Sequence, residues 1–300
     1  MPELPEVETI RRGLDRALAG RVICDVCISE TRLRRKVDAR RLKVFTVGQA
    51  IEKVDRRAKY LLCRLSNQAT LILHLGMSGR ILLCDHSLPL EKHDHIQFRL
   101  DDGRELRFRD PRRFGLVDAV ANDELANHSL FANLGIEPFD PACTAQFLFE
   151  RSRRLTKPIK NFLMDGTIIV GIGNIYANEA LFRTRLHPQA AAGKLKLPDW
   201  RKLLKAIHET LELAIAAGGT TLNDFHDSDG AMGYFQQQLL VYGREGEACH
   251  VCGKKIKRVV QAGRSTFYCR HCQAKKSALT STISKVKKLG KGISETRKRR

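Results

Sequence analysis

Short runs of alternating apolar and polar residues follow one another through the first half of the chain. They cover residues 21–29, 44–54, 59–65, 70–75, 80–84, 95–100 and 104–109. Because successive side chains of a strand point to opposite faces of a sheet, each run predicts a half-buried strand. The sequence Asp-Asp-Gly at 101–103 predicts a hairpin turn between the last two strands. Many short strands joined by tight turns favour a β-sandwich or barrel.

Helical periodicity appears at the start of the chain and again in its second half. Val7, Ile10, Leu14 and Leu18 recur at helical spacing, and Gly20 can end that helix. The clearest later stripe consists of Leu203, Leu204, Ile207, Leu211, Ala214 and Ile215, and glycines at 218 and 219 can stop it. The predicted fold class is therefore α+β and multidomain, with one helix and a β-sandwich followed by a helical domain.

The change of periodicity near residue 140 divides the chain. We predict an N-terminal β-domain at 2–138, a linker at 139–145 and a helical domain at 146–244. A cysteine-rich ribbon follows at 245–273 and a basic tail at 274–300. The tail has no aromatic residue and no apolar run large enough for a core, so we expect it to be disordered.

Positive charge narrows the choice of partner. The chain has 53 Lys and Arg against 33 Asp and Glu, a formal net charge of +20, and the residues after 272 supply +9 of it. A polyanion is therefore the expected partner, with nucleic acid first and an acidic membrane surface second. No stretch approaches the roughly 18 apolar residues of a membrane span, and the start of the chain lacks the pattern of a signal peptide. We expect a soluble cytoplasmic protein that needs no membrane.

Four of the nine cysteines form two Cys-x-x-Cys pairs, Cys249 with Cys252 and Cys269 with Cys272. In an intracellular chain such pairs favour a metal over disulfides. Each pair makes a tight turn that directs two thiolates to one point, and two such turns complete a tetrahedral Zn²⁺ shell. The sequence therefore predicts a zinc ribbon with one structural ion, because four thiolates leave no open position for a substrate.

Two other pairs resemble metal motifs without completing one. Cys24 and Cys27 have the same spacing but lie in a predicted strand, where residues three apart face opposite sides. We interpret them as packing thiols. His93 and His95 share a face of a predicted strand, yet no third ligand is evident nearby, so hydrogen bonding is favoured over chelation.

A glycine-rich turn in the helical domain has a possible binding role. Gly171 and Gly173, followed by Asn174 and a helical run, place backbone amides at a helix N-terminus, where an anion such as a phosphate can bind. The alternative is an ordinary tight turn between helices. Together with a zinc hairpin, this turn would contact phosphates and position a duplex without reading its base sequence.

The chain's start offers the most direct chemistry. Removal of Met1 before the small residue Pro2 would leave a secondary amine, with Glu3 and Glu6 close behind. A terminal amine has a much lower pKa than a lysine, so it can attack an electrophilic carbon, and neighbouring carboxylates can move protons. The alternative is that these glutamates only suit the N-terminus of a helix.

A series of sequence segments completes the picture. They are PELPEVET from residue 2, RRAKYLL from 56, HLGMSGR from 74, KHDH from 92, DPRRFG from 110, KNFLMDG from 160, VGIGNIYANEALF from 170, GGTTL from 218, SDGAMGYF from 228, VYGREGEAC from 241 and STFYCRHCQ from 265. Together they resemble the bacterial formamidopyrimidine-DNA glycosylase family. The resemblance covers residues 2–273 in order and with compatible spacing, and only the basic tail departs from it.

The resemblance implies a bifunctional glycosylase and AP lyase of base-excision repair. Such an enzyme removes oxidised purines, chiefly 8-oxoguanine opposite cytosine and formamidopyrimidines, from double-stranded DNA. It implies an N-terminal β-sandwich, a helix-two-turns-helix domain and a four-cysteine zinc ribbon, with DNA in the cleft between them. A monomer associated with the bacterial nucleoid and without a catalytic metal is expected.

The resemblance also assigns catalytic residues by position. Pro2 matches the nucleophile, which forms a Schiff base that undergoes β and δ eliminations. Glu3 matches the proton donor at the sugar, and Glu6 matches a supporting carboxylate. Lys59 and Arg264 match further residues of the catalytic group, and both also match phosphate-contacting positions.

Other residues match positions that contact DNA. Met77, Arg112 and Phe114 match the three that fill the space left by a flipped base, with Arg112 donating to the orphaned cytosine. Asn174 matches a phosphate contact, and Lys160 matches a basic position near the lesion. His93, in KHDH, is included among the predicted DNA-binding residues. The segment 218–234 resembles the one that closes over the lesion.

Two alternatives stay open from the sequence. An endonuclease VIII-like enzyme for oxidised pyrimidines shares Pro2 and Glu3, but its start usually reads PEGPE where this chain has PELPE. Met77 and the DPRRFG segment favour the purine enzyme. The second alternative is a zinc-containing DNA-binding protein without catalysis. An intact set of Pro2, Glu3, Lys59 and Asn174 argues against it.

Overall fold

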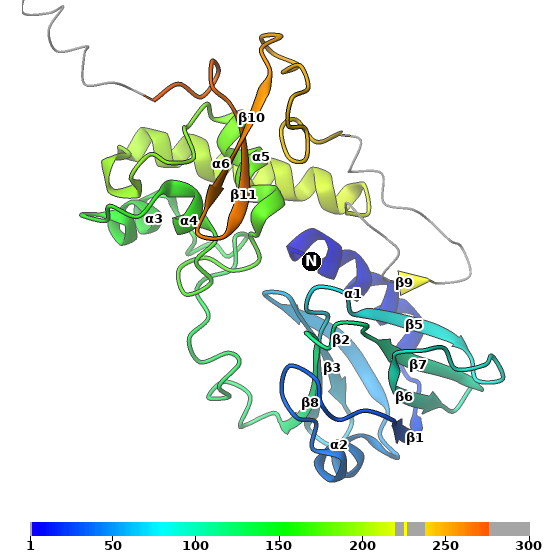
Figure 1. The fold of residues 1–300 in the computed structure, drawn as a ribbon. Helices are drawn as coiled ribbons and strands as arrows, with labels where there is room; N and C mark the ends of the chain where they lie inside the picture. Colours follow the sequence, from blue (N-terminus) through cyan, green and yellow to red (C-terminus); the bar gives the residue numbers. More distant parts are fainter. Residues whose placement is uncertain (1, 220–224, 227–237, 276–300) are drawn as a thin grey trace, which may run out of the picture.

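The computed structural model describes residues 2–219, 225–226 and 238–275 (Figure 1). An N-terminal half rich in strands and a C-terminal half rich in helices lie on either side of the chain's start. Residues 276–300 of the predicted tail at 274–300 lie outside the described residues, as does most of the segment 218–234.

Helix α1 (Leu4–Leu18) forms where the helical spacing predicted it. Its apolar stripe, Val7, Ile10, Leu14 and Leu18, is buried against the sandwich. The helix begins with a capping box, in which the Glu6 side chain accepts a hydrogen bond from the backbone N–H of the residue three positions earlier. Figure 1 shows α1 between the strands and the helices of the second half.

Two sheets form the predicted β-sandwich. One has the order β1 (Ile23–Ile28), β6 (Asp94–Leu100), β7 (Arg104–Arg109), β5 (Arg80–Asp85) and β9 (Phe225–His226). The other has the order β2 (Ile51–Arg57), β3 (Tyr60–Leu65), β4 (Ala69–His74) and β8 (Leu116–Ala121). All pairings within these two sheets are antiparallel except β5 with β9. The predicted hairpin at 101–103 joins β6 to β7.

The prediction of a strand over 44–54 was wrong at its start. Residues Ala39–Thr46 form helix α2, capped by the Asp38 side chain, which accepts a hydrogen bond from Arg41 N at 2.9 Å. Only from Ile51 does the chain enter a strand. Asp38 is the signal for this helix, since a short polar residue before a helical run is a favoured N-cap.

A β-bulge in β1 changes which face of the sheet the side chains of this strand point to. The pairing with β6 shifts between Ile23 and Asp25, so the alternation is interrupted there. Cys24 is exposed and Cys27 half-buried, so the interpretation of Cys24 as a packing thiol was wrong.

The C-terminal half packs its helices around one apolar core. They are α3 (Ala145–Ser152), α4 (Ile159–Leu163), α5 (Asn174–Arg183), the short 3₁₀ helix η1 (Ala192–Lys194) and α6 (Leu197–Ala216). The predicted stripe of α6 faces that core, with Leu203, Ile207, Leu211 and Ala214 buried. No helix among the described residues is long and apolar enough to cross a membrane.

The chain then forms a hairpin of β10 (Ile256–Gln261) and β11 (Arg264–Cys269). The hairpin lies against α5, and Phe267 N donates to Asn178 Oδ1 at 2.8 Å. A small cluster of buried apolar side chains, which includes Phe182, Val241 and Ile256, packs between the hairpin and the helical domain. In this way the ribbon becomes part of the helical half.

Candidate functional site

The carboxylate of Glu3 lies at the N-terminus of α5, although 170 residues separate Glu3 from Gly173 in sequence. It accepts hydrogen bonds from Gly173 N at 2.8 Å, Ile175 N at 2.9 Å and Tyr176 N at 3.3 Å. The amide groups at a helix N-terminus carry partial positive charge and lack partners within the helix. The helix end that was predicted to bind a phosphate therefore binds this chain's own carboxylate.

The approach of Glu3 requires the glycines of the turn. A Cβ on Gly173 would lie 2.3 Å from the Glu3 side chain, and one on Gly171 would lie 2.6 Å from Leu4. Leu4 N also donates to Gly171 O at 3.0 Å, which ties the first turn of α1 to this loop. The glycines are needed here for close approach of two segments.

Pro2 is buried beside this arrangement, and Glu6 supports it from the first turn of α1. Glu6 Oε2 accepts from Glu3 N at 2.8 Å, and Glu6 Oε1 accepts from the Tyr176 hydroxyl at 2.5 Å. Tyr176 belongs to α5 and is itself buried. The first residues of the chain are therefore fixed through both glutamates by one helix.

Lys59 and Arg264 bring positive charge to the same place from two other elements. Burial raises the pKa of Glu3, while the nearby Lys59 lowers it and Glu6 raises it. Burial lowers the pKa of Lys59, against the effect of Glu3 and together with that of Arg264. Lys59 follows β2 and Arg264 begins β11, so the strand domain and the ribbon each supply one cation.

Lys160 is placed differently from the expectation of a DNA contact. It is 1% exposed, and its Nζ donates to Ser265 O at 2.9 Å and to Thr266 Oγ1 at 2.7 Å. Burial, with Arg264 nearby, lowers the pKa of Lys160 to about 8. Its ammonium holds the tip of the ribbon hairpin and is not presented to solvent.

Asn174 holds the same tip. Its Nδ2 donates to Ser265 O at 2.9 Å, so one carbonyl accepts from both Asn174 and Lys160. Farther along α5, the buried Glu179 accepts hydrogen bonds from the backbone N–H groups of residues 240–242 at 2.9–3.0 Å. Helix α5 therefore positions Glu3, the hairpin that carries Arg264 and the chain leading into the ribbon.

Met77 and Phe114 are side chains that a folded core would normally bury, yet they are 45% and 44% exposed. The guanidinium of Arg112 lies 4.7 Å from the centre of the Phe114 ring. With Arg34 and His74, Met77 and Phe114 line a surface hollow of about 240 Å³. Exposed apolar groups beside a cation suit insertion into a base stack.

Asp110, the first residue of the DPRRFG segment, joins the two loops that carry Met77 and Phe114, although it was not among the predicted site residues. Its buried carboxylate accepts from Ser78 Oγ at 2.6 Å and from Gly115 N at 2.7 Å. His95 Nε2 contacts the carbonyl of Asp110 at 2.9 Å, as the hydrogen-bonding interpretation of that histidine expected. His93 precedes β6 with a φ of 79°, so its placement on the strand was wrong.

The four cysteines of the ribbon come together as predicted. Their Sγ atoms all lie within 4.8 Å of one another, with 3.9 Å between Cys249 and Cys272 and 3.4 Å between Cys252 and Cys269. Tetrahedral zinc with Zn–S bonds of about 2.3 Å requires sulfurs about 3.8 Å apart, so the donor set fits that ion. Among the described residues no other cluster of this kind occurs.

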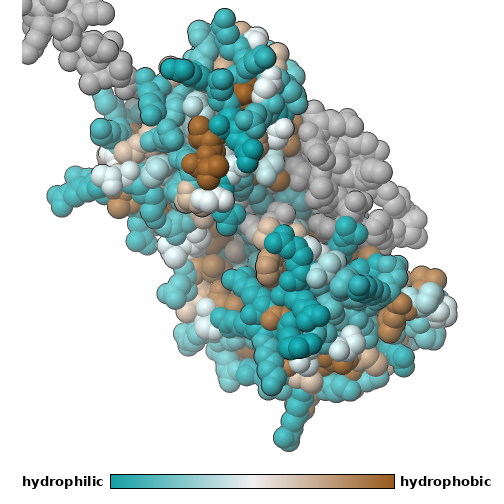
Figure 2. Space-filling view, in the orientation of Figure 1, coloured by the Kyte–Doolittle hydropathy of each residue, from teal (hydrophilic) through white to brown (hydrophobic). Residues whose placement is uncertain are grey.

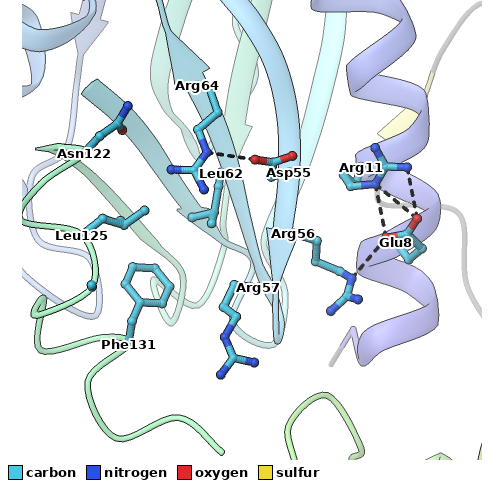
Figure 3. Close-up of a pocket in the computed structure, with 11 residues that line it drawn as sticks. Glu8, Arg11, Asp55, Arg56, Arg57, Leu62, Arg64, Asn122, Leu125 and Phe131 are labelled. Carbon is cyan, nitrogen blue, oxygen red and sulfur yellow. Dashed lines mark hydrogen bonds and ion pairs between the residues drawn. The ribbon is translucent and has the colours of Figure 1, made fainter. Parts of the chain in front are cut away.

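A larger hollow of about 610 Å³ lies on the β2–β3 side, next to α1 (Figure 3). Four arginines line this hollow. Two of them form ion pairs with acidic residues, Arg56 with Glu8 and Arg64 with Asp55. The hollow contains none of the predicted catalytic residues. On the face that Figure 2 shows, the surface of both halves is mostly hydrophilic.

The site as a whole combines a buried acid, two cations and the chain's first residues between the two halves. Such a group can hold an electrophilic carbon near residue 2, exchange protons through Glu3 and balance negative charge with Lys59 and Arg264. The four cysteines would give a metal a full set of protein ligands in a separate part of the hairpin, which suits a structural role.

Three family models match the chain. They describe the formamidopyrimidine-DNA glycosylase N-terminal domain at residues 1–117, the formamidopyrimidine-DNA glycosylase H2TH domain at 134–226 and a zinc finger found in FPG and IleRS at 246–275. The formamidopyrimidine-DNA glycosylases of Teredinibacter turnerae and Geobacter sulfurreducens are 46% and 48% identical to this chain over 273 residues. These alignments cover 91% of this chain and 100% of each relative.

Solved structures agree with these matches. Wild-type Lactococcus lactis Fpg (MutM) in complex with DNA containing N7-benzyl-Fapy-dG has a TM-score of 0.84 and 34% identity to this chain. The same protein with DNA containing an oxidized pyrimidine has a TM-score of 0.83 and 34% identity. Each match covers 91% of this chain and 100% of the other.

Proposed function

This chain belongs to the formamidopyrimidine-DNA glycosylase family and is a DNA glycosylase of base-excision repair; on that premise we propose that its site both excises the damaged base and nicks the strand. The observation that carries the proposal is the fixed position of Glu3. Glu3, the residue next to Pro2, is buried, and its carboxylate accepts hydrogen bonds from three backbone amides. Lys59 is close enough to lower the pKa of Glu3, and Arg264 is close enough to lower the pKa of Lys59. A proton donor and two cations around one amine suit attack at a sugar carbon.

The chemistry follows from the properties of the amine. After removal of Met1, the Pro2 nitrogen forms a bond to C1′ of the damaged nucleotide, and the bond from C1′ to the base breaks. Burial raises the pKa of Glu3, which favours its protonated form and lets it donate a proton to O4′ as the C1′–O4′ bond breaks and the Pro2 nitrogen becomes an iminium. The resulting iminium acidifies C2′, so the same intermediate can lose the 3′ phosphate and then the 5′ phosphate by β and δ elimination.

Lys59 and Arg264 have the charge that the elimination steps require. Each departing phosphate carries negative charge that a nearby cation stabilises. Because Arg264 is exposed at the hairpin tip and Lys59 is half-buried on the strand domain, we infer that they contact the backbone on the two sides of the lesion. Lys160 and Asn174 support Arg264 through Ser265.

DNA binding is proposed to use the exposed group around Met77. A base must leave the duplex before its C1′ can be attacked, and an apolar plug can replace the lost stacking. The exposure of Met77 and Phe114 supports that role, and the guanidinium of Arg112 can donate to the unpaired base opposite. His93, which is half-buried, is proposed as a further contact.

Several finer expectations belong to this proposal. One structural Zn²⁺ would hold the ribbon through Cys249, Cys252, Cys269 and Cys272, and the fit of their sulfurs supports it. The domain boundary at 244 falls between the second and third family-model matches, which end at 226 and begin at 246. The boundaries at 138, 145, 244 and 273 stay predictions, as do monomeric DNA binding and association with the nucleoid.

The preferred lesion is proposed to be an oxidised purine, 8-oxoguanine opposite cytosine or a formamidopyrimidine. Oxidised pyrimidines are a second candidate because the Lactococcus lactis protein was solved with such a DNA. Sodium borohydride trapping on a duplex with 8-oxoguanine opposite cytosine tests the proposal, with mass spectrometry to locate the adduct. We expect an adduct on residue 2 in the wild type, and we expect a Pro2→Gly variant to keep duplex binding but lose most strand cleavage.

The other outcomes separate the alternatives. Trapping only on an oxidised-pyrimidine duplex would replace the purine proposal by the pyrimidine one. Binding of both duplexes without an adduct on either would show that this chain binds DNA without Schiff-base chemistry.

A further inference from the structure

A short strap, residues 134–137, connects the two halves of the catalytic site. Its last residue, Glu137, binds three consecutive residues at the end of β2. Glu137 Oε2 accepts from Arg56 Nη1 at 2.8 Å, and its Oε1 accepts from Arg57 Nη1 at 3.0 Å and from Ala58 N at 2.6 Å. Lys59 is the next residue along the chain, so the Glu137 carboxylate binds the turn that directly precedes Lys59.

That turn has a conformation that needs support. Ala58 has a φ of 53°, in the left-handed region that costs a residue with a Cβ about 1 kcal/mol or more. Ala58 is also 5% exposed, so its N–H would lack a partner without Glu137. Figure 3 shows Arg56 and Arg57 extending from β2, with Arg56 bonded to Glu8 of α1 as well.

The other edge of the strap binds the helical half. Gly135 N donates to Gly166 O at 2.8 Å, Ile136 N donates to Ile168 O at 3.1 Å, and Val170 N donates back to Ile136 O at 2.9 Å. A Cβ on Gly135 would lie 2.4 Å from the backbone of Ile168, so the two segments are in close contact.

Val170 leads directly into the glycine turn that holds the chain's start. The next residue, Gly171, accepts the hydrogen bond from Leu4 N, and Gly173 donates to the Glu3 carboxylate. One four-residue strap is therefore bonded both to the turn before Lys59 and to the segment that places Glu3.

We propose that Glu137 is a positioning residue that sets Lys59 relative to Glu3 through the turn at 56–58. The inference rests on the proposed function, because it concerns the rate of the chemistry at Pro2. Lys59 belongs to the strand domain, whereas Glu3 precedes α1, which packs on that domain, and is bonded to α5 of the helical half; the separation of Lys59 and Glu3 therefore depends in part on how the two halves are joined. Catalysis is sensitive to such placement, since an error of about 1 Å can cost about 100-fold in rate.

The test compares Glu137→Ala with Glu124→Ala, which also removes an ion pair of the strand domain, between Glu124 and Arg41, outside the site. Single-turnover nicking is measured on a duplex with a preformed abasic site, and affinity on one with a tetrahydrofuran analogue. We expect Glu137→Ala to nick about 10- to 100-fold more slowly while its affinity stays within about two-fold of wild type. The control should match the wild type in both assays.

A double-mutant cycle separates positioning from general loosening. If Glu137 acts through Lys59, its removal should cost little further rate in a Lys59→Met background. Glu137→Gln, which keeps one acceptor oxygen for Ala58 N, should restore part of the lost rate and serves as the test variant if the alanine variant unfolds.

The outcomes are distinct. Absence of a borohydride adduct in the wild type would defeat the proposed function itself. With an active wild type, equal rates for Glu137→Ala and Glu124→Ala, or a full loss that persists in the Lys59→Met background, would overturn the positioning role.

Discussion

Substitution of Gly173 by alanine is expected to displace the carboxylate of Glu3 while leaving its chemistry in place. The new Cβ would lie 2.3 Å from the Glu3 side chain, where ordinary contacts are 3.4–4 Å. Either Glu3 or the helix end must therefore retreat by about 1 Å. Gly173 has a φ of −118°, so the substitution adds no left-handed backbone strain of its own.

The displacement would weaken the three hydrogen bonds that Glu3 accepts, at 2.8, 2.9 and 3.3 Å. Because a misplacement of about 1 Å in a catalytic group can cost about 100-fold, we expect base excision to slow by about that factor. Loss of the amide donors should also raise the pKa of Glu3 further, since those donors oppose the effect of burial.

The assay is single-turnover excision of 8-oxoguanine, with borohydride trapping on the same duplex. Gly166→Ala is the matched control, because a Cβ there meets nothing within 4 Å and the residue lies in the same half. Both variants should bind a tetrahydrofuran duplex like the wild type. Excision by Gly173→Ala at the rate of the Gly166→Ala control would refute the argument that the close contact at the α5 N-terminus positions Glu3.

Three further predictions concern the metal, the charge and the pH response. Cys269→Ser should lose zinc and duplex affinity together; a zinc-free protein with full affinity would contradict the structural role of the ion. A chain ending at Gln273 should bind undamaged duplex less tightly at low salt, with a shallower salt dependence and nearly unchanged excision; an unchanged slope would count against the tail. Burial lowers the pKa of His74 to about 4. Because its ordinary value is 6.5, the folded state binds fewer protons than the unfolded one between pH 6.5 and 4, and about 3 kcal/mol of unfolding free energy should be lost as the pH falls through that window. Denaturant titrations at both ends should show a smaller loss in His74→Asn, which keeps an acceptor for Gly76 N but does not titrate.

Local pattern was enough for most of the fold. The strands at 59–65, 80–84 and 104–109 formed close to their predicted bounds, although β3 and β7 are buried at successive positions and not on one face only, as the alternation had predicted. The strand at 116–121 was not predicted, and the helix α2 was taken for the start of a strand. The strand at 116–121 is determined by its pairing with β4, and α2 is indicated by one N-cap residue, Asp38. Short-range alternation of apolar and polar residues contains neither signal.

The resemblance supplied candidate site residues, but their contacts could not be predicted from the sequence. The glycine turn before Asn174 was correctly placed at a helix N-terminus, yet its anion is Glu3, which lies 170 residues away in sequence. Lys160 was predicted by resemblance to be a DNA-binding residue near the lesion, but its burial and its contact with Ser265 could not be read from the sequence. Asp110 and Glu179 are likewise ordinary acids whose partners include backbone N–H groups.

The burial of Glu3 explains why these non-local contacts matter for the chemistry. Burial alone would favour a neutral acid, whereas the amides of the α5 N-terminus and Lys59 favour the carboxylate. The balance leaves the pKa of Glu3 raised, and it depends on distances to elements that belong to both halves of the protein. On the proposed function, a change in the joint between the halves is expected to alter proton transfer at Pro2 even when no proposed catalytic residue is replaced, because the strap at 134–137 and the glycines at 171 and 173 hold the segments that place Lys59 and Glu3.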